Sequence, residues 1–214
     1  MRLGALSGIL WLVLSLGGLG LLAAGGFNVP SGSSADSFAA LASAFPPMQV
    51  HLGLYLHTLS SLLLVVFAAR VWATLRVAEG SPAWLSTAAF GAALLGAAGT
   101  TFMLNAVFAA IAVRAGHGLD AQTTATLYEI ARGGYATGDR LLTLFAGLAS
   151  IVVLRTRVLP RWLGWLGAIA ALLGIVGRAP GLEAAGELAL GLGLGTFYLW
   201  SLALAVTLLV RRES

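Results

Sequence analysis

Six apolar stretches dominate the sequence, and four of them contain no charged side chain. They cover residues 3–25, 48–75, 85–113, 135–154, 162–176 and 188–210. A helix needs about 20 apolar residues to cross the hydrocarbon core of a bilayer, and every stretch except 162–176 reaches that length. Residues 62–69 lack the alternation of barrel strands, so we expect helices. The sequence predicts an all-α integral membrane bundle of about six transmembrane helices, with five or seven left open.

Composition excludes a water-soluble globular protein. Charged residues make up 9% of the chain and hydrophobic residues 59%, whereas a soluble domain carries about 25% charged residues. Cysteine is absent, which excludes disulfides and thiolate metal sites. The net charge of +4 comes from scattered arginines, so we expect membrane lipid and no nucleic acid as a partner. No long repeat divides the chain, and residues 1–214 are predicted to form a single transmembrane helical domain.

Arginine placement predicts the orientation of the helices. Eight arginines fall at one set of alternate helix ends: Arg2, Arg70, Arg76, Arg155, Arg157, Arg161, Arg211 and Arg212. By the positive-inside rule these ends and both termini are cytoplasmic. Residues 1–25 resemble a signal peptide, but their apolar region is about twice the usual length of roughly 7 to 15 residues. We therefore expect an uncleaved anchor.

Two segments on the outer side are predicted to form short interfacial helices. Residues 31–47 contain Asp36 as a possible cap and end at Pro46 and Pro47. Residues 119–132 begin near Asp120, and Gly133 with Gly134 would close the helix.

Polar residues with helical spacing indicate which helix faces meet protein. One stripe in the last helix repeats every four residues and comprises Glu183, Glu187, Gly191 and Gly195. A second, in the fourth long stretch, comprises Asp139, Thr143, Gly147 and Ser150. Arg140 adjoins it, and Arg114 and Arg178 stand at the outer ends of other helices. Charges at this depth are expected to converge, either as an ion-pair belt that fixes helix register or as a polar pocket.

Further polar side chains could complete such a pocket in the outer half of the bundle. The candidate ligand-binding residues are His51, Tyr55, His57, Asn105, Arg140, Arg178 and Tyr198. Asn105 could instead bond two helices together. His51 and His57 are six residues apart and cannot both bind one iron, but either could pair with His117 across a b-type haem.

Three functions remain open. The leading hypothesis is a membrane protein that binds a lipid-soluble small molecule or a partner subunit through the outer polar cluster. The alternative is a membrane enzyme that uses Glu183, Glu187 or Asp139 for acid-base catalysis on an isoprenoid, quinone or lipid. A haem-binding electron carrier is the weaker alternative, and no metal site other than haem is expected.

The segment Val158-Leu159-Pro160-Arg161-Trp162-Leu163-Gly164-Trp165-Leu166-Gly167 resembles a signature of small bacterial multi-pass membrane proteins. In that domain-of-unknown-function family, a Leu-Pro-x-Trp-Leu-Gly-Trp run opens a late membrane helix after a basic loop. The resemblance implies a helical bundle in the bacterial inner membrane. It carries no active site. Pro160 is expected just before or at the first turn of this helix.

Overall fold

The computed structural model describes residues 2–26, 34–43, 48–114, 117–177 and 183–211, and these residues form seven helices and no strand. The helices are α1 (Arg2–Ala24), α2 (Ala35–Ser43), α3 (Met48–Glu79), α4 (Trp84–Arg114), α5 (Ala121–Thr156), α6 (Arg161–Val176) and α7 (Glu183–Val210). α1, α3, α4, α5 and the segment Gly191–Val210 of α7 are long and apolar enough to cross a membrane, and α6 is shorter. The predicted all-α membrane bundle is confirmed.

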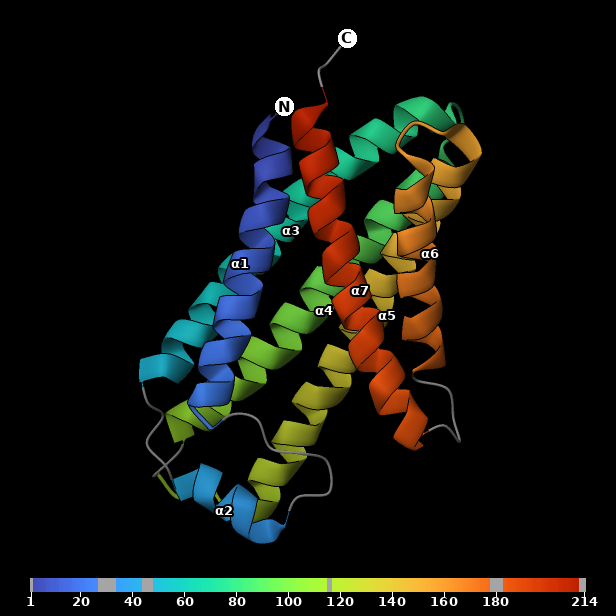
Figure 1. The fold of residues 1–214 in the computed structure, drawn as a ribbon. Helices are drawn as coiled ribbons and strands as arrows, with labels where there is room; N and C mark the ends of the chain where they lie inside the picture. The colour runs from blue at the N-terminus through green and yellow to red at the C-terminus, as the bar shows by residue number, and fades with distance from the viewer. Residues whose placement is uncertain (1, 27–33, 44–47, 115–116, 178–182, 212–214) are drawn as a thin grey trace.

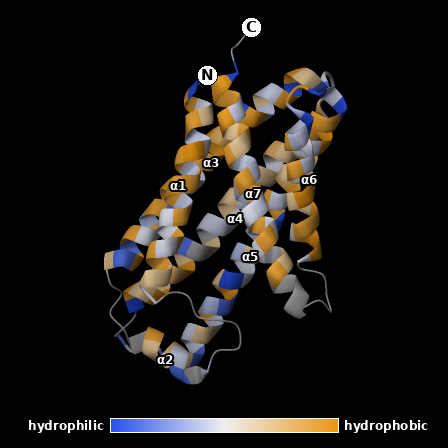
Figure 2. Ribbon diagram, in the orientation of Figure 1, coloured by the Kyte–Doolittle hydropathy of each residue, from blue (hydrophilic) through white to orange (hydrophobic). Residues whose placement is uncertain are grey.

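Both termini lie at one end of the bundle, together with the α3–α4 and α5–α6 connections (Figure 1). We call this the arginine-rich end, and the opposite end, where α2 lies, the α2 end. Hydrophobic residues cover most of α1, α6 and α7, and hydrophilic residues gather toward the helix ends (Figure 2). This distribution is typical of helices that cross a bilayer.

Small residues let neighbouring helices approach closely. The predicted stripe on α5 is confirmed as a contact surface, because it packs against α6. A Cβ atom on Gly174 would lie 2.5 Å from Thr143 Cγ2, and one on Gly167 would lie 2.3 Å from Ser150 Oγ. A Cβ atom on Gly147 would lie 3.0 Å from the Ala171 Cβ atom.

The prediction for the α7 stripe is wrong for the members whose side chains the structure describes. Gly191 and Gly195 are exposed, and a Cβ atom on either would meet nothing within 4 Å. Gly193 lies against α6 instead, where its Cβ atom would be 3.0 Å from the Gly174 backbone nitrogen. Phe197 and Trp200 continue this face and are buried. Burial of these large aromatic side chains sets the orientation of α7, which the four-residue spacing of glycines does not reveal.

One of the two predicted short helices is a separate element. It is α2, whose first turn contains Asp36 and whose Phe38 ring packs edge-on against Tyr128 of α5 at 5.8 Å. Pro46 and Pro47, the predicted end of this segment, lie outside the described residues.

The second predicted short helix is not separate, because residues 121–132 form the first part of α5. This helix continues through Gly133 and Gly134 to Thr156. Asp120 does cap its start, since the Thr123 backbone N–H donates to Asp120 Oδ1 at 2.8 Å. A Cβ atom on Gly134 would lie 2.2 Å from Met103 Cγ, so this glycine permits contact with α4 rather than ending the helix.

Buried hydrophobic side chains form two separate clusters. The larger lies toward the arginine-rich end and includes Trp11, Phe67, Phe145, Phe197 and Trp200. The smaller lies toward the α2 end and includes Leu22, Phe38, Val50, Phe108 and Tyr128. The residues between these clusters are the ones from which a functional site can be built.

Candidate functional site

Polar side chains lie between the two hydrophobic clusters, and we call them the polar layer. They are Ser15, His57, Ser60, Ser61, Thr100, Thr101, Asn105, Tyr135, Asp139 and Tyr198. On each of α1, α3, α4 and α5, these polar residues lie, in chain order, between the buried residues that the helix contributes to one cluster and those that it contributes to the other. Tyr198 of α7 joins the layer through the hydrogen bonds described below. Polar side chains at such a depth are costly unless they bond to one another or serve a function.

On the α3 and α4 side of the polar layer, hydroxyl and amide groups connect the two helices. Thr101 Oγ1 donates to Ser61 Oγ, and Asn105 Nδ2 donates to Thr58 Oγ1 at 2.6 Å. Within α3, the Ser60 and Ser61 hydroxyls donate to the His57 carbonyl oxygen at 2.7 and 3.1 Å. The predicted role of Asn105 as a bond between helices is confirmed.

On the opposite side, the polar layer connects α1, α5 and α7. The Tyr198 hydroxyl is hydrogen-bonded to the hydroxyls of Ser15 and Tyr135. Its ring packs edge-on against Trp11 at 5.8 Å. Asp139 is buried and lies close enough to both tyrosines to interact with them electrostatically. The structure therefore brings together two of the predicted site residues, Asp139 and Tyr198.

His57 lies in the same layer, and its side chain is 4% exposed. Neither Nδ1 nor Nε2 has a hydrogen-bond partner among the described residues. The imidazole ring is 6.4 Å from the Tyr135 ring, measured between centroids. Along α3 it stands about 14 Å from Met48, well inside the helix. Because buried polar groups are nearly always hydrogen-bonded, an imidazole with two unused nitrogens is unusual.

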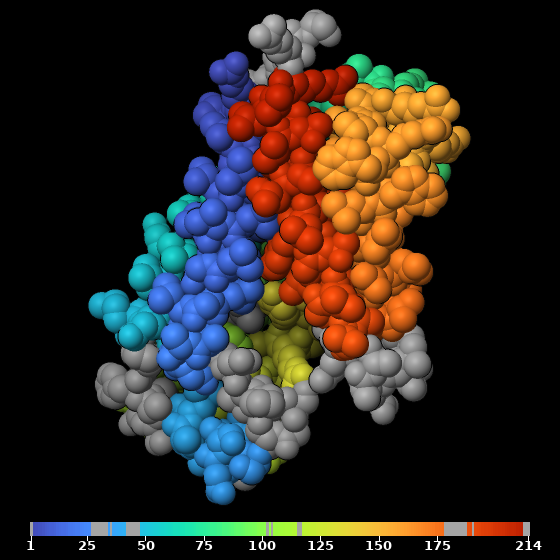
Figure 3. All heavy atoms as spheres, in the orientation of Figure 1, coloured from blue at the N-terminus to red at the C-terminus, as the bar shows by residue number. Residues whose placement is uncertain are grey.

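A hollow adjoins the polar layer between α1 and α7. The two helices are in contact at Gly8 with Ala205, at Trp11 with Phe197 and at Ser15 with Tyr198. Toward the α2 end they separate (Figure 1), and Figure 3 shows the space between them as a hollow with α5 at its floor. Ser15 and Tyr198 form the contact nearest the α2 end of these three, so the two helices separate beyond this contact.

Several predicted site residues lie outside the polar layer. His51 and Tyr55 are exposed on α3, with Tyr55 at 64%, and they face away from the bundle. Arg140 is exposed on α5, and His117 is exposed in the turn before α5. Of the three histidines proposed for haem, His57 alone lies inside the bundle. Within the described residues, no group of three His, Cys, Asp or Glu side chains could hold a metal ion.

The structure describes only part of the predicted carboxylate site. Asp139, Arg140, Thr143, Gly174 and Leu194 surround a cavity of about 10 Å³. That volume is the minimum for one water molecule and cannot hold a substrate. The backbones of Glu183 and Glu187 belong to α7, but their side chains, like the whole of Arg178, lie outside the described residues.

The sequence analysis did not identify Tyr135 as a site residue. It contacts His57 and Tyr198 and therefore connects the two sides of the polar layer. A signal was available, since Tyr135 precedes Asp139 by four residues and extends the same α5 stripe by one turn.

The segment that carried the family resemblance has the predicted local structure. Pro160 is the residue before α6, at the N-cap position, and Trp162 and Trp165 are 54% and 62% exposed. Comparison with known proteins adds no relative, because no family model, curated protein or solved structure matches the chain. Membership of the bacterial family therefore stays a prediction.

Proposed function

We propose that the chain is a multi-pass protein of a bacterial cytoplasmic membrane that binds a lipid-soluble small molecule at the polar layer. In this proposal both termini are cytoplasmic. The support for this orientation is the concentration of arginines at the end where both termini lie. The hollow between α1 and α7 then lies in the half of the bundle that faces away from the cytoplasm.

The buried imidazole of His57 is the observation that carries this proposal. An unpartnered polar group in an apolar interior destabilises a protein by about 1–3 kcal/mol. Both nitrogens of His57 lack a partner among the described residues, yet the ring is 4% exposed. A bound molecule that hydrogen-bonds to this ring would remove that cost.

The surroundings of His57 define the chemistry of the ligand. A neutral imidazole offers one donor and one acceptor, and the Tyr135 ring, whose hydroxyl is hydrogen-bonded to that of Tyr198, lies 6.4 Å away between centroids. This set suits a carbonyl or hydroxyl group on an otherwise apolar molecule. The apolar part would lie in the hollow, which opens sideways between α1 and α7 (Figure 3). Such an opening admits a molecule from the hydrocarbon region rather than from water.

Native mass spectrometry of the full chain in mild detergent tests the proposal. We expect a stoichiometric small molecule on the wild-type protein and about tenfold lower occupancy in His57→Phe, which retains a ring but loses both nitrogens. His51→Phe is the matched control, because His51 lies on the same helix with its side chain exposed. It should retain the ligand.

Stability separates a binding role for His57 from a structural one. Replacing an unpartnered buried polar ring by an apolar ring should maintain or raise the thermal midpoint of the ligand-free protein. A lower midpoint in His57→Phe, or equal ligand occupancy in both variants, would contradict the proposal. A wild-type protein that carries no ligand but a second protein chain would instead support the partner-subunit alternative.

Catalysis by Asp139 is the second candidate function. Asp139 is buried and lies close to the tyrosine pair, so a ligand held by these hydroxyls would be near a carboxyl group that can transfer a proton. In Asp139→Asn we expect the site still to be occupied, but by a molecule of different mass from the one on the wild-type protein, because the unreacted substrate would accumulate. An unchanged bound mass would leave binding alone as the function.

A further inference from the structure

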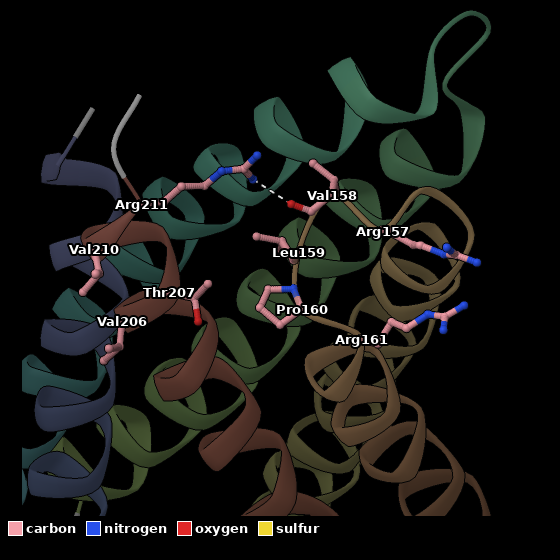
Figure 4. A pocket seen from close by; sticks show the side chains of 9 residues that line it. All are labelled: Arg157, Val158, Leu159, Pro160, Arg161, Val206, Thr207, Val210 and Arg211. Atoms are coloured by element: carbon pink, nitrogen blue, oxygen red, sulfur yellow. Dashed lines mark hydrogen bonds between the residues drawn. The ribbon is translucent and has the colours of Figure 1, made fainter. Parts of the chain in front are cut away.

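The groove at the arginine-rich end does not bring its charged side chains together. It has a volume of about 770 Å³ and lies between the end of α7 and the connection from α5 to α6. Figure 4 shows Arg157 and Arg161 extending away from the groove and from Arg211. The Arg211 guanidinium donates to the Val158 carbonyl oxygen at 2.8 Å. Three buried polar atoms without a hydrogen-bond partner among the described residues lie in the polar layer instead.

Asn105 Oδ1 is one of these three atoms, and the two ring nitrogens of His57 are the others. Neighbouring hydrogen bonds fix the orientation of the Asn105 amide. The Thr58 hydroxyl donates to the Leu54 carbonyl oxygen at 2.9 Å, so its oxygen accepts from Asn105. Nδ2 therefore faces Thr58 at 2.6 Å, and the carbonyl end of the amide points away from that residue.

The Asn105 amide and the His57 ring belong to neighbouring parts of the α3–α4 contact. Thr58 follows His57 directly in the chain, so the Asn105 amide nitrogen lies within about 9 Å of the His57 Cα atom. Thr101 and Ser61 make the next hydrogen bond between the two helices, about one turn away. The polar head of one small ligand can therefore serve both groups.

The hydroxyl groups around these atoms use their protons within the protein. The Ser60 and Ser61 hydroxyls donate to the His57 carbonyl oxygen. The Thr101 hydroxyl donates to Ser61. On this side of the polar layer, the described atoms left without a partner are two acceptors and one donor: Asn105 Oδ1, one imidazole nitrogen and the imidazole N–H. What is missing here is a donor.

This count separates ligands by the polar group that they carry. A carbonyl oxygen only accepts, so it would pair with the His57 N–H and leave Asn105 Oδ1 without a partner. A hydroxyl group accepts from the N–H and also donates its own proton to the amide oxygen. Because a buried acceptor without a partner weakens binding, the hydroxyl compound is favoured.

We propose that the polar layer selects an apolar alcohol, whose hydroxyl donates to Asn105 Oδ1 and accepts from the N–H of His57. This inference rests on the binding function proposed above and narrows its ligand from a carbonyl or hydroxyl compound to a hydroxyl compound. Asn105 then has two roles. Its Nδ2 joins α4 to α3, and its Oδ1 determines which ligands bind.

Two probes that differ only in whether the oxygen carries a proton or a methyl group test this selection. They are the isoprenoid alcohol farnesol and its methyl ether, each added at equal concentration to the full chain in mild detergent. Native mass spectrometry measures their occupancy. We expect the wild-type protein to bind about fivefold more farnesol than ether, and Asn105→Ala to lose this preference. The preference is a ratio measured on one preparation, so partial unfolding of a variant lowers both occupancies and leaves the ratio unchanged.

Thr101→Val is the matched control for Asn105→Ala. Thr101 also stands on α4 and bonds to α3, but its hydroxyl is paired with Ser61. This variant loses one hydrogen bond between the helices and should retain the preference for farnesol. Loss of the preference in Thr101→Val would assign it to the α3–α4 contact as a whole and overturn the inference.

Two further outcomes distinguish this inference from the binding function on which it rests. Equal occupancy of the two probes on the wild-type protein, or an unchanged preference in Asn105→Ala, would overturn the selection for an alcohol and leave the binding function intact. Absence of both probes from the wild-type protein, or their full retention by His57→Phe, would contradict the binding function and the inference with it.

Discussion

Gly18 of α1 and Gly53 of α3 face each other where the two helices cross. A Cβ atom on either glycine would lie 2.9 Å from the carbonyl oxygen of the other. A clash with backbone cannot be relieved by a side-chain rotation, so this crossing requires glycine on both helices.

We expect Gly18→Val and Gly53→Val to destabilise the protein by about 1–3 kcal/mol, because each forces α1 away from α3. Thermal unfolding in detergent measures this effect. Gly17→Val is the control, since a Cβ atom on Gly17 would meet nothing within 4 Å. Equal stability of the Gly17 and Gly18 variants would show that the helices do not cross here.

The hydrogen bond from Asn105 Nδ2 to Thr58 Oγ1 should couple α4 to α3 by about 0.6 kcal/mol, with an upper value near 1.7 kcal/mol. A double-mutant cycle with Asn105→Ala and Thr58→Val measures this coupling through unfolding free energies. Thr196→Val is a suitable control, because the Thr196 hydroxyl donates to its own helix at Leu192. Strict additivity in the Asn105 and Thr58 cycle would contradict the bond.

The carboxylate of Glu79 caps the start of α4 across the α3–α4 connection. Its two oxygens accept from the backbone N–H groups of Leu85 at 3.0 Å and Ser86 at 2.8 Å. We expect Glu79→Ala to cost about 1 kcal/mol of unfolding free energy, as the loss of other helix caps does. Glu129→Ala should cost less, because Glu129 is exposed and its 4.0 Å pair with Arg132 lies on the surface. A Glu79 variant as stable as the Glu129 variant would show that the cap contributes nothing.

The start of α5 should depend on pH through Asp120. The Thr123 hydroxyl and backbone N–H donate to this carboxylate and lower its pKa below the ordinary value of 3.8. The cap therefore stabilises the first turn fully above that value and is lost as the pH falls through the lowered pKa. Hydrogen exchange at Thr123 and Thr124, corrected for intrinsic rates, should increase over this acidic range.

Asp120→Asn provides the control for this pH dependence. Asparagine accepts the same backbone hydrogen bond but does not titrate. The acid-dependent increase in exchange should disappear in this variant, and its persistence would assign the effect to another group.

Hydrophobic patterning in the sequence predicted the helices but not all of their boundaries. Length and apolar content identified every long helix because these properties are local to each segment. Gly133 and Gly134 were misinterpreted, because a glycine pair can end a helix or let another helix approach. The contact between Gly134 and Met103 decides between these roles, and it depends on the position of α4.

Only those parts of the candidate site that depend on which residues share one face of a helix were predictable from the sequence. The stripe of Asp139, Thr143, Gly147 and Ser150 was located correctly, and His57 was placed on a different face of its helix from His51 and Tyr55. Periodicity groups residues on one helix but does not name the helix that lies opposite. The prediction for the α7 stripe was wrong for this reason. The sequence also did not reveal that Tyr135 lies with His57 and Tyr198, because these residues are on three different helices.

With 36 residues, α5 is about 54 Å long, whereas the hydrocarbon core of a bilayer measures about 30 Å. Its part toward the α2 end carries Tyr128, against which Phe38 of α2 packs, and two unbroken turns later comes Tyr135. A helix without a break behaves as a stiff rod over such a distance. The contact of Phe38 with Tyr128 therefore joins α2 to the same continuous helix that carries Tyr135 into the polar layer, so a displacement of α2 has a rigid element to act on.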